Sequence, residues 1–225
     1  MKANLLKTLG AAGVLAISLI ARGGIIYDNT STDSGFFLGA TNGQQIGDQI
    51  TMGSSSALFV TNFSFEYYSP NSVFSGTVQA DVSFYYNTAP NISGYLAPGA
   101  TPFFDTGFFG ISAPNSIFPG TNSAILSFDL PNVLVPTNFT FVVSFTGLAG
   151  GDIVGVELFN PITVGQNTPD YWYLNNGGTW TLMTNNATPV NFGAQITGTV
   201  PEPGVISLSI LGGAALLAAV RRRRS

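Results

Sequence analysis

Apolar and polar residues alternate with a period of two along much of the middle of the chain. In Val78–Phe84 the apolar side chains fall on one face, whereas Gln79 and Asp81 fall on the other. The same alternation recurs at 59–67, 123–130, 139–146 and 192–196. A period of two is typical of antiparallel strands with one face in the core and one face in solvent.

Further strands are expected where short apolar stretches lie between turn residues, at 25–27, 45–51, 103–111, 153–159, 171–174 and 179–183. The separators carry the residues that turns favour, such as Asn87 to Asn91 and Pro119-Gly120. The run Asn175-Asn176-Gly177-Gly178 has the composition of a hairpin tip. About ten short strands at this spacing predict one all-β domain, a β-sandwich or jelly roll, which we place at residues 24–198.

The N-terminus has the pattern of an export signal. Lys2 and Lys7 provide a positive start, an apolar core follows at 9–20, and Ala21 and Gly23 offer small side chains at the two positions that cleavage requires. We therefore expect a signal peptide at 1–23, with the export translocon and signal peptidase as partners.

The last residues place three features in order. A strip with two prolines precedes an apolar run and an arginine cluster: Val200, Pro201, Glu202 and Pro203, then Val205–Val220, then Arg221, Arg222, Arg223 and Arg224. The prolines favour extended backbone that a protease can read. As a helix the apolar run spans about 24 Å, against about 30 Å for a bilayer core, so it is a short transmembrane helix at about 205–220. Clustered Arg stays cytoplasmic, which places the domain across the membrane.

Residues 199–225 resemble the PEP-CTERM sorting signal of Gram-negative bacteria, through Pro201-Glu202-Pro203, the apolar run and the arginine cluster. The resemblance implies cleavage near the motif by a membrane-embedded exosortase and delivery to the cell surface or extracellular matrix. This tail is also called the ice-binding protein C-terminal domain. The rest of the chain has no Thr repeat that would build a flat ice-binding face. An uncut single-pass membrane anchor is the alternative reading of the tail.

Charge is divided sharply between the ends and the body. All seven basic residues lie in the two terminal segments. Residues 24–200 contain no Lys or Arg but ten acidic residues: Asp28, Asp33, Asp48, Glu66, Asp81, Asp105, Asp129, Asp152, Glu157 and Asp170. Such a body cannot neutralise phosphates, so nucleic acid is excluded as a partner. The chain also lacks His and Cys, which removes the usual bases and nucleophiles of catalysis.

Four aromatic residues gather around the predicted hairpin at 171–180. They are Tyr171, Trp172, Tyr173 and Trp180. Exposed aromatic rings of β-sandwich modules stack on sugars, which makes an extracellular polysaccharide a candidate ligand. The alternative is that both Trp rings fill the core with their N–H groups bonded to backbone.

The carboxylates offer weaker candidates. Asp28 and Asp33 flank a loop rich in Thr, Asn and Ser and are weak candidates for a Ca²⁺ site, although single Asp residues also cap turns. We expect no other cofactor. A glycosidase needs two acids about 5–10 Å apart in a cleft. The only Glu residues of the body, Glu66 and Glu157, lie on predicted strands with no expected connection, so we expect no enzyme.

Together these features predict an exported cell-surface or matrix protein without catalysis, anchored in the membrane as a precursor. Its expected role is structural or matrix-interacting. The first alternative is a carbohydrate-binding module that uses the 171–180 hairpin, and the second is a polysaccharide hydrolase.

Overall fold

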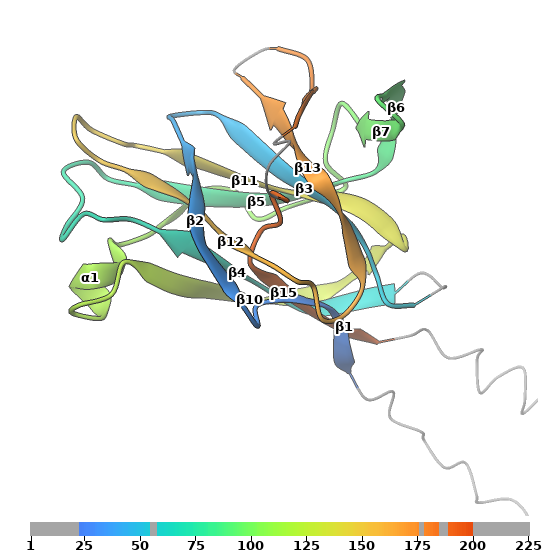
Figure 1. The fold of residues 1–225 in the computed structure, drawn as a ribbon, viewed down its shortest axis with the longest axis horizontal. Helices are drawn as coiled ribbons and strands as arrows, with labels where there is room; N and C mark the ends of the chain where they lie inside the picture. Colours follow the sequence, from blue (N-terminus) through green and yellow to red (C-terminus); the bar gives the residue numbers. More distant parts are fainter. Residues whose placement is uncertain (1–22, 55–57, 176–177, 185–188, 200–225) are drawn as a thin grey trace, which may run out of the picture.

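The computed structural model describes residues 23–54, 58–175, 178–184 and 189–199. In this part of the chain two antiparallel sheets pack against each other (Figure 1), with a separate two-stranded hairpin and one short helix, α1 (Pro114–Ile117), at the periphery. The prediction of an all-β fold is confirmed, and the arrangement is sandwich-like.

Six strands form sheet A: β1 (Gly24–Asn29), β2 (Asp33–Ala40), β4 (Leu58–Tyr68), β10 (Ser123–Val135), β12 (Val154–Phe159) and β15 (Ala194–Thr199). β10 pairs along one edge of β4, while β15 and β12 share the other edge. β1 then pairs with β15, and β2 pairs with β12. β2 is therefore an edge strand.

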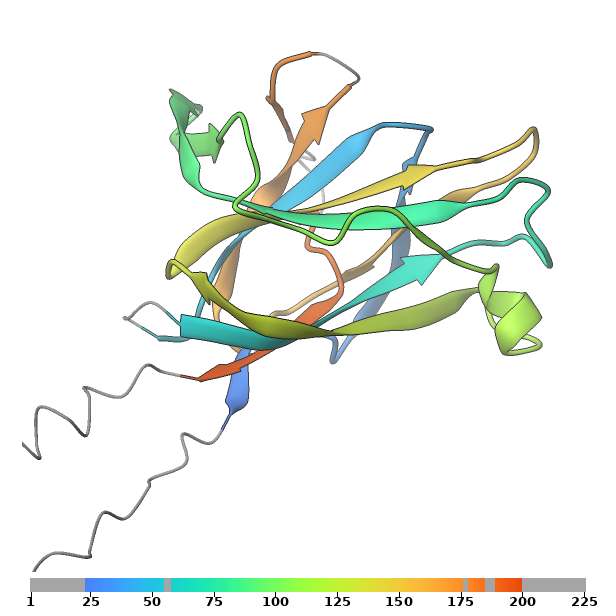
Figure 2. The same ribbon diagram turned by 180° about the vertical axis from the view of Figure 1, so that it is seen from behind.

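Seven strands form sheet B: β3 (Gln45–Thr51), β5 (Gln79–Tyr85), β8 (Phe104–Asp105), β9 (Phe109–Gly110), β11 (Asn138–Thr146), β13 (Gln166–Leu174) and β14 (Thr181–Met183). Their order is β14-β13-β3-β11-β5, and β8 and β9 both pair with β5. The separate hairpin joins β6 (Asn87–Ile92) to β7 (Tyr95–Pro98). Figure 2 shows this hairpin beside the β13–β14 end of the molecule.

Aromatic rings from both sheets meet in the core. Phe63 of β4 lies 5.3 Å from Phe84 of β5 and 5.3 Å from Phe141 of β11, centroid to centroid. The edge-to-face angles of 66° and 62° are those that aromatic quadrupoles favour. Since the chain has no Cys, this packing must hold the sheets together without a disulfide.

Several segments differ from the sequence prediction. The strand at 33–40 was not predicted, because the run from Phe36 to Leu38 lacks alternation; as an edge strand it exposes apolar side chains on both faces. The single strand expected at 103–111 is two strands of two residues each. Residues 87–91, expected as a turn, belong to β6, which pairs only with β7.

The two ends of the described domain lie side by side. Gly24 of β1 is the register partner of Gly198 of β15, and Figures 1 and 2 show both ends leaving the same region. The predicted signal peptide, apart from Gly23, and the predicted sorting tail, apart from Thr199, lie outside the described residues. No helix within the described residues has the length and apolar character needed to cross a membrane.

Candidate functional site

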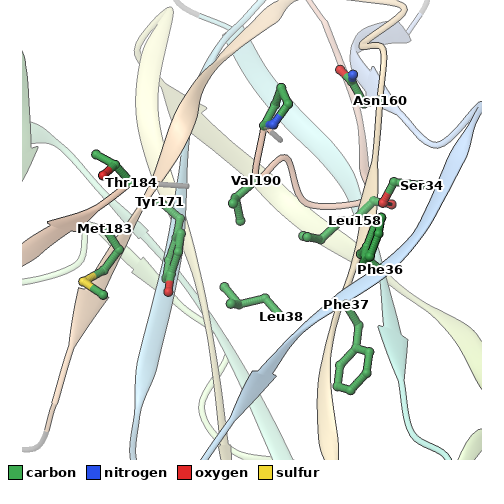
Figure 3. A pocket seen from close by; sticks show the side chains of 11 residues that line it. Ser34, Phe36, Phe37, Leu38, Leu158, Asn160, Tyr171, Met183, Thr184 and Val190 are labelled. Atoms are coloured by element: carbon green, nitrogen blue, oxygen red, sulfur yellow. Dashed lines mark hydrogen bonds between the residues drawn. The ribbon is translucent and has the colours of Figure 1, made fainter. Parts of the chain in front are cut away.

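A cleft opens where the edge of sheet A faces the edge of sheet B, between β2 and the β13–β14 pair (Figure 3). Its volume is about 480 Å³, which lies within the usual range for small-ligand pockets. We call it the edge cleft, and it is lined by Ser34, Phe36, Phe37, Leu38, Leu158, Asn160, Tyr171, Met183, Thr184, Pro189 and Val190.

Strand alternation determines which aromatic side chains line the two sides of the edge cleft. On β13, Tyr171 faces the space between the sheets and packs against the core. On β2, Phe36 is 62% exposed at the opposite side of the cleft. Figure 3 shows these two side chains on opposite sides of the opening. Leu158 and Val190, both buried, provide apolar surface between them.

The polar groups of the edge cleft are neutral. Ser34 Oγ donates to the Leu158 carbonyl at 2.7 Å, which fixes the start of β2 against β12. Burial, and then the nearby Tyr173, raises the pKa of Tyr171, so its phenol keeps its proton at neutral pH. The lining residues include no Asp, Glu or His. Rings, hydroxyls and amides without charge suit a neutral polyhydroxylated ligand, and they provide no nucleophile with a base.

Trp172 does not offer a surface for a ligand. Its side chain is fully buried and lies on the opposite face of β13 from Tyr171. The indole N–H donates to Gln49 Oε1 at 3.3 Å. Its register partner is Gly47, where a Cβ atom would come within 2.8 Å of Thr140 Cγ2. The expectation of Trp172 as a sugar platform is therefore corrected: a fully buried ring has no free face to stack on a sugar.

Trp180 lines a different hollow. Its ring meets Tyr85 edge-to-face at 5.5 Å, and its N–H donates to the Gly99 carbonyl at 3.3 Å. We call this hollow the flap pocket; its volume is about 440 Å³, and its lining is Pro90, Ile92, Ala97, Pro98, Ala100, Leu174, Gly178, Thr179 and Trp180. Tyr173 packs against the core and lines neither hollow. Of the predicted aromatic group, Tyr171 lines the edge cleft and Trp180 the flap pocket, while Trp172 and Tyr173 line neither.

Asp28 and Asp33, the two Ca²⁺ candidates, make local hydrogen bonds. Asp28 accepts from the hydroxyls of Thr30 at 2.7 Å and Thr163 at 3.0 Å. Asp33 accepts from the Gly35 N–H at 2.7 Å, as a turn cap does. Within the described ranges, no group of three or more acidic residues has a geometry that could hold a metal ion.

Glu66 and Glu157 are closer in space than the sequence indicated. β4 and β12 are paired strands, so the expectation of unconnected strands was wrong. Their apolar residues, such as Phe65 and Val156, face the core, which places both Glu side chains on the outer face of sheet A. Neither residue lines the edge cleft or the flap pocket.

Asp48 is a buried acid that the sequence analysis did not single out. It is fully buried between the sheets, where its Oδ2 accepts from the Phe192 N–H at 2.9 Å and from Asn167 Nδ2 at 3.2 Å. Burial raises the pKa of Asp48 from 3.8 to about 7. Its spacing of two residues from Ile46 and from Ile50 was the available signal, because period-two alternation puts all three on one face.

A scan against models of protein families gave no match, and searches among curated proteins and solved structures gave none either. No activity is therefore carried over from a relative. The chemistry of the edge cleft and the two ends of the chain are the grounds for a functional proposal.

Proposed function

We propose that this chain is an exported surface or matrix protein, sorted by its C-terminal tail, whose domain binds an uncharged stretch of an extracellular polysaccharide in the edge cleft without catalysis. The observation that carries the binding role is the placement of Phe36 and Tyr171 on opposite sides of one apolar cleft of about 480 Å³. Sugar rings have apolar faces that stack on aromatic rings and hydroxyls that bond to neutral polar groups.

The arrangement of the ends supports a tethered domain. Gly24 pairs with Gly198, so a chain processed after Gly23 would keep its new N-terminus next to the strip that leads to the tail. β13, which carries one side of the edge cleft, ends at the top of Figures 1 and 2, whereas the described termini leave at the bottom. A ligand can approach that region without passing the tether.

Binding to neutral polysaccharides tests the proposal. The protein purified from cells that express the full 225-residue sequence is run in native gels that contain a neutral soluble polysaccharide, over a panel of such polymers. We expect at least one polymer to retard it. Phe36→Ala should weaken that binding about tenfold, which equals about 1.4 kcal/mol. Because Phe36 is 62% exposed, this change removes a ring with little effect on the core.

The controls separate the two hollows. Phe108→Ala removes another exposed ring, 51% exposed, outside both hollows and should leave binding unchanged. Loss of binding in Trp180→Ala with normal binding in Phe36→Ala would move the site to the flap pocket and overturn the edge cleft. Retardation by none of the polymers would overturn the carbohydrate-binding role altogether.

The intact mass of the protein from its native host tests the sorting role. A chain that ends near Val200–Gly204 and is found outside the cell supports exosortase processing. A mass that still includes Val205–Ser225, in the membrane fraction, would instead make the protein a tail-anchored envelope protein.

A further inference from the structure

Three carboxylates and two aromatic rings lie together on the outer face of sheet A. β2, β12 and β4 are neighbours there, and they carry Asp33 and Phe37, Glu157, and Glu66 and Tyr68, respectively. Phe37 is the register partner of Glu157. We call Asp33, Glu66 and Glu157 the acidic patch and Phe37 with Tyr68 the ring pair.

A shared peptide holds Glu66 and Glu157 next to each other. The Gly193 N–H donates to the Glu157 carbonyl at 2.8 Å, and the Gly193 carbonyl accepts from the Glu66 N–H at 2.9 Å. The two glutamates therefore flank one backbone unit on the same face of the sheet. A Cβ at Gly193 would come within 2.4 Å of the Phe159 ring, so this close approach needs glycine.

The Glu157 carboxylate is buried, and its hydrogen bonding within the described residues is incomplete. Its side chain is only 6% exposed, and its Oε2 has no hydrogen-bond partner among the described residues. Burial, and then repulsion by Asp33 and Glu66, raises the pKa of Glu157 to about 7. When ionised, the carboxylates of the acidic patch are acceptors only, and residues 24–200 supply no Lys or Arg to donate to them.

The ring pair adds a partly exposed aromatic surface beside the acidic patch. Phe37 stacks on Tyr68 with a centroid distance of 4.2 Å and an interplanar angle of 24°. Phe37 remains 38% exposed, so part of its surface is open to a ligand. Aromatic faces attract cations, and they also pack against the apolar faces of sugar rings.

We propose that the acidic patch and the ring pair bind the protonated amine of an amino sugar in the polysaccharide. An ammonium group donates up to three hydrogen bonds and carries the positive charge that the patch lacks. The sugar ring that bears it has an apolar face for Phe37. A metal ion fits less well, because no group of three or more acidic residues in the described ranges has a geometry that could hold one.

The position of Phe37 connects this site to the edge cleft. Phe37 lines the edge cleft and also belongs to the ring pair, so β2 contributes to both sites. A polysaccharide seated in the cleft would bring a neighbouring sugar to the acidic patch. The inference rests on the proposed function for the kind of polymer, and its test uses different residues and a different ligand series.

Titration calorimetry with two matched oligosaccharides tests the inference. The protein from cells expressing the full sequence is titrated with a β-1,4-linked glucosamine tetramer and with its N-acetylated form, which has no charge. At about pH 6, below the pKa of an ordinary amine, we expect the glucosamine tetramer to bind about tenfold more tightly. Its binding should weaken with added salt and should release protons, because an ammonium favours the ionised form of Glu157.

Charge-matched variants locate the site. Glu66→Gln and Glu157→Gln should each reduce the preference for the amine several-fold, and the double variant should abolish it. Asp129→Asn removes the same charge from an exposed carboxylate on β10 that bonds to Asn62, and it should keep the preference.

The outcomes distinguish this inference from the proposed function. Equal binding of both tetramers, lost in Phe36→Ala, would overturn the amine site and leave the edge cleft intact. A preference for the amine that survives in the double variant, or falls equally in Asp129→Asn, would also overturn it. Ca²⁺ binding that depends on Glu157, without any preference for the amine, would show that the patch serves a metal instead.

Discussion

The outer faces of the two sheets differ in how their polar side chains are hydrogen-bonded. On sheet B, neutral side chains bond to one another: Gln49 Nε2 donates to Asn138 Oδ1 at 3.2 Å, and Thr140 Oγ1 donates to Asn87 Oδ1 at 2.7 Å. Asp81 on the same face accepts from the hydroxyls of Ser83 at 3.1 Å and Thr106 at 3.0 Å. On sheet A, the acidic patch gathers carboxylates around Glu157, whose Oε2 has no partner among the described residues. Both faces carry aromatic residues, but Trp172 on sheet B is fully buried and Phe37 on sheet A is partly exposed.

The difference follows from what each group can donate and accept. Amides and hydroxyls do both, so a cluster of them can satisfy itself. Ionised carboxylates only accept, and in a body without Lys or Arg they depend on neutral donors, as Asp48 does on the Phe192 N–H and Asn167. We infer that the outer face of sheet B is built for stability, and that the outer face of sheet A is available for a ligand that brings its own donors.

The strongest challenge to this comparison is Trp172→Ala. If the outer face of sheet B is a second packed layer, the loss of a fully buried indole and its bond to Gln49 should lower the free energy of unfolding by about 3–5 kcal/mol. Urea denaturation followed by circular dichroism measures it. Trp180→Ala, at a half-buried ring, should cost clearly less. Equal losses in the two variants would contradict the assignment of Trp172 to a stabilising layer.

The pH dependence of stability probes the interior between the two faces. Folded Asp48 holds its proton up to about pH 7, whereas the unfolded chain releases it near 3.8. Unfolding therefore releases a proton between these values, so stability should fall as pH rises through this window. The full effect of one such proton is about 1.4 kcal/mol per pH unit, and Tm measured at intervals across the window will show its direction.

Asp48→Asn isolates this contribution. The amide oxygen can still accept from the Phe192 N–H, and it does not ionise. The variant should therefore show a flatter pH profile, whereas Asp129→Asn, at an exposed carboxylate, should keep the wild-type slope. A wild-type slope in Asp48→Asn would mean that the pH dependence comes from other carboxylates.

The alternation of side chains predicted the central strands of the sheets, but it did not predict which strand faces are covered or which strand lies at an edge. It correctly gave strands at β4, β5, β10 and β11 and placed Trp172 opposite Tyr171. It did not reveal which face of β13 would be covered, because that depends on neighbours distant in sequence, such as Gln49, which accepts from the Trp172 N–H. It also missed β2, whose position at an edge relaxes the two-residue period.

The acidic patch could not be predicted for a similar reason. Glu66 and Glu157 become neighbours only through the pairing of β4 with β12 and the peptide of Gly193. No local pattern encodes that pairing. The lack of any Lys or Arg in residues 24–200 was visible in the sequence, and it means that no cationic side chain of the body can pair with these carboxylates.

Glu157→Gln gives the smallest expected effect on stability and the most selective test of the comparison. Replacing a crowded carboxylate by an amide of the same shape should raise the free energy of unfolding at neutral pH, by less than about 1 kcal/mol after allowance for solvent screening. Thermal unfolding at neutral pH and at about pH 5 measures it, and the gain should shrink at the lower pH, where Glu157 is already protonated. A loss of stability instead would show that the carboxylate has a partner within the fold. A gain in stability with a loss of amine preference would mean that the patch is retained for binding at the expense of stability.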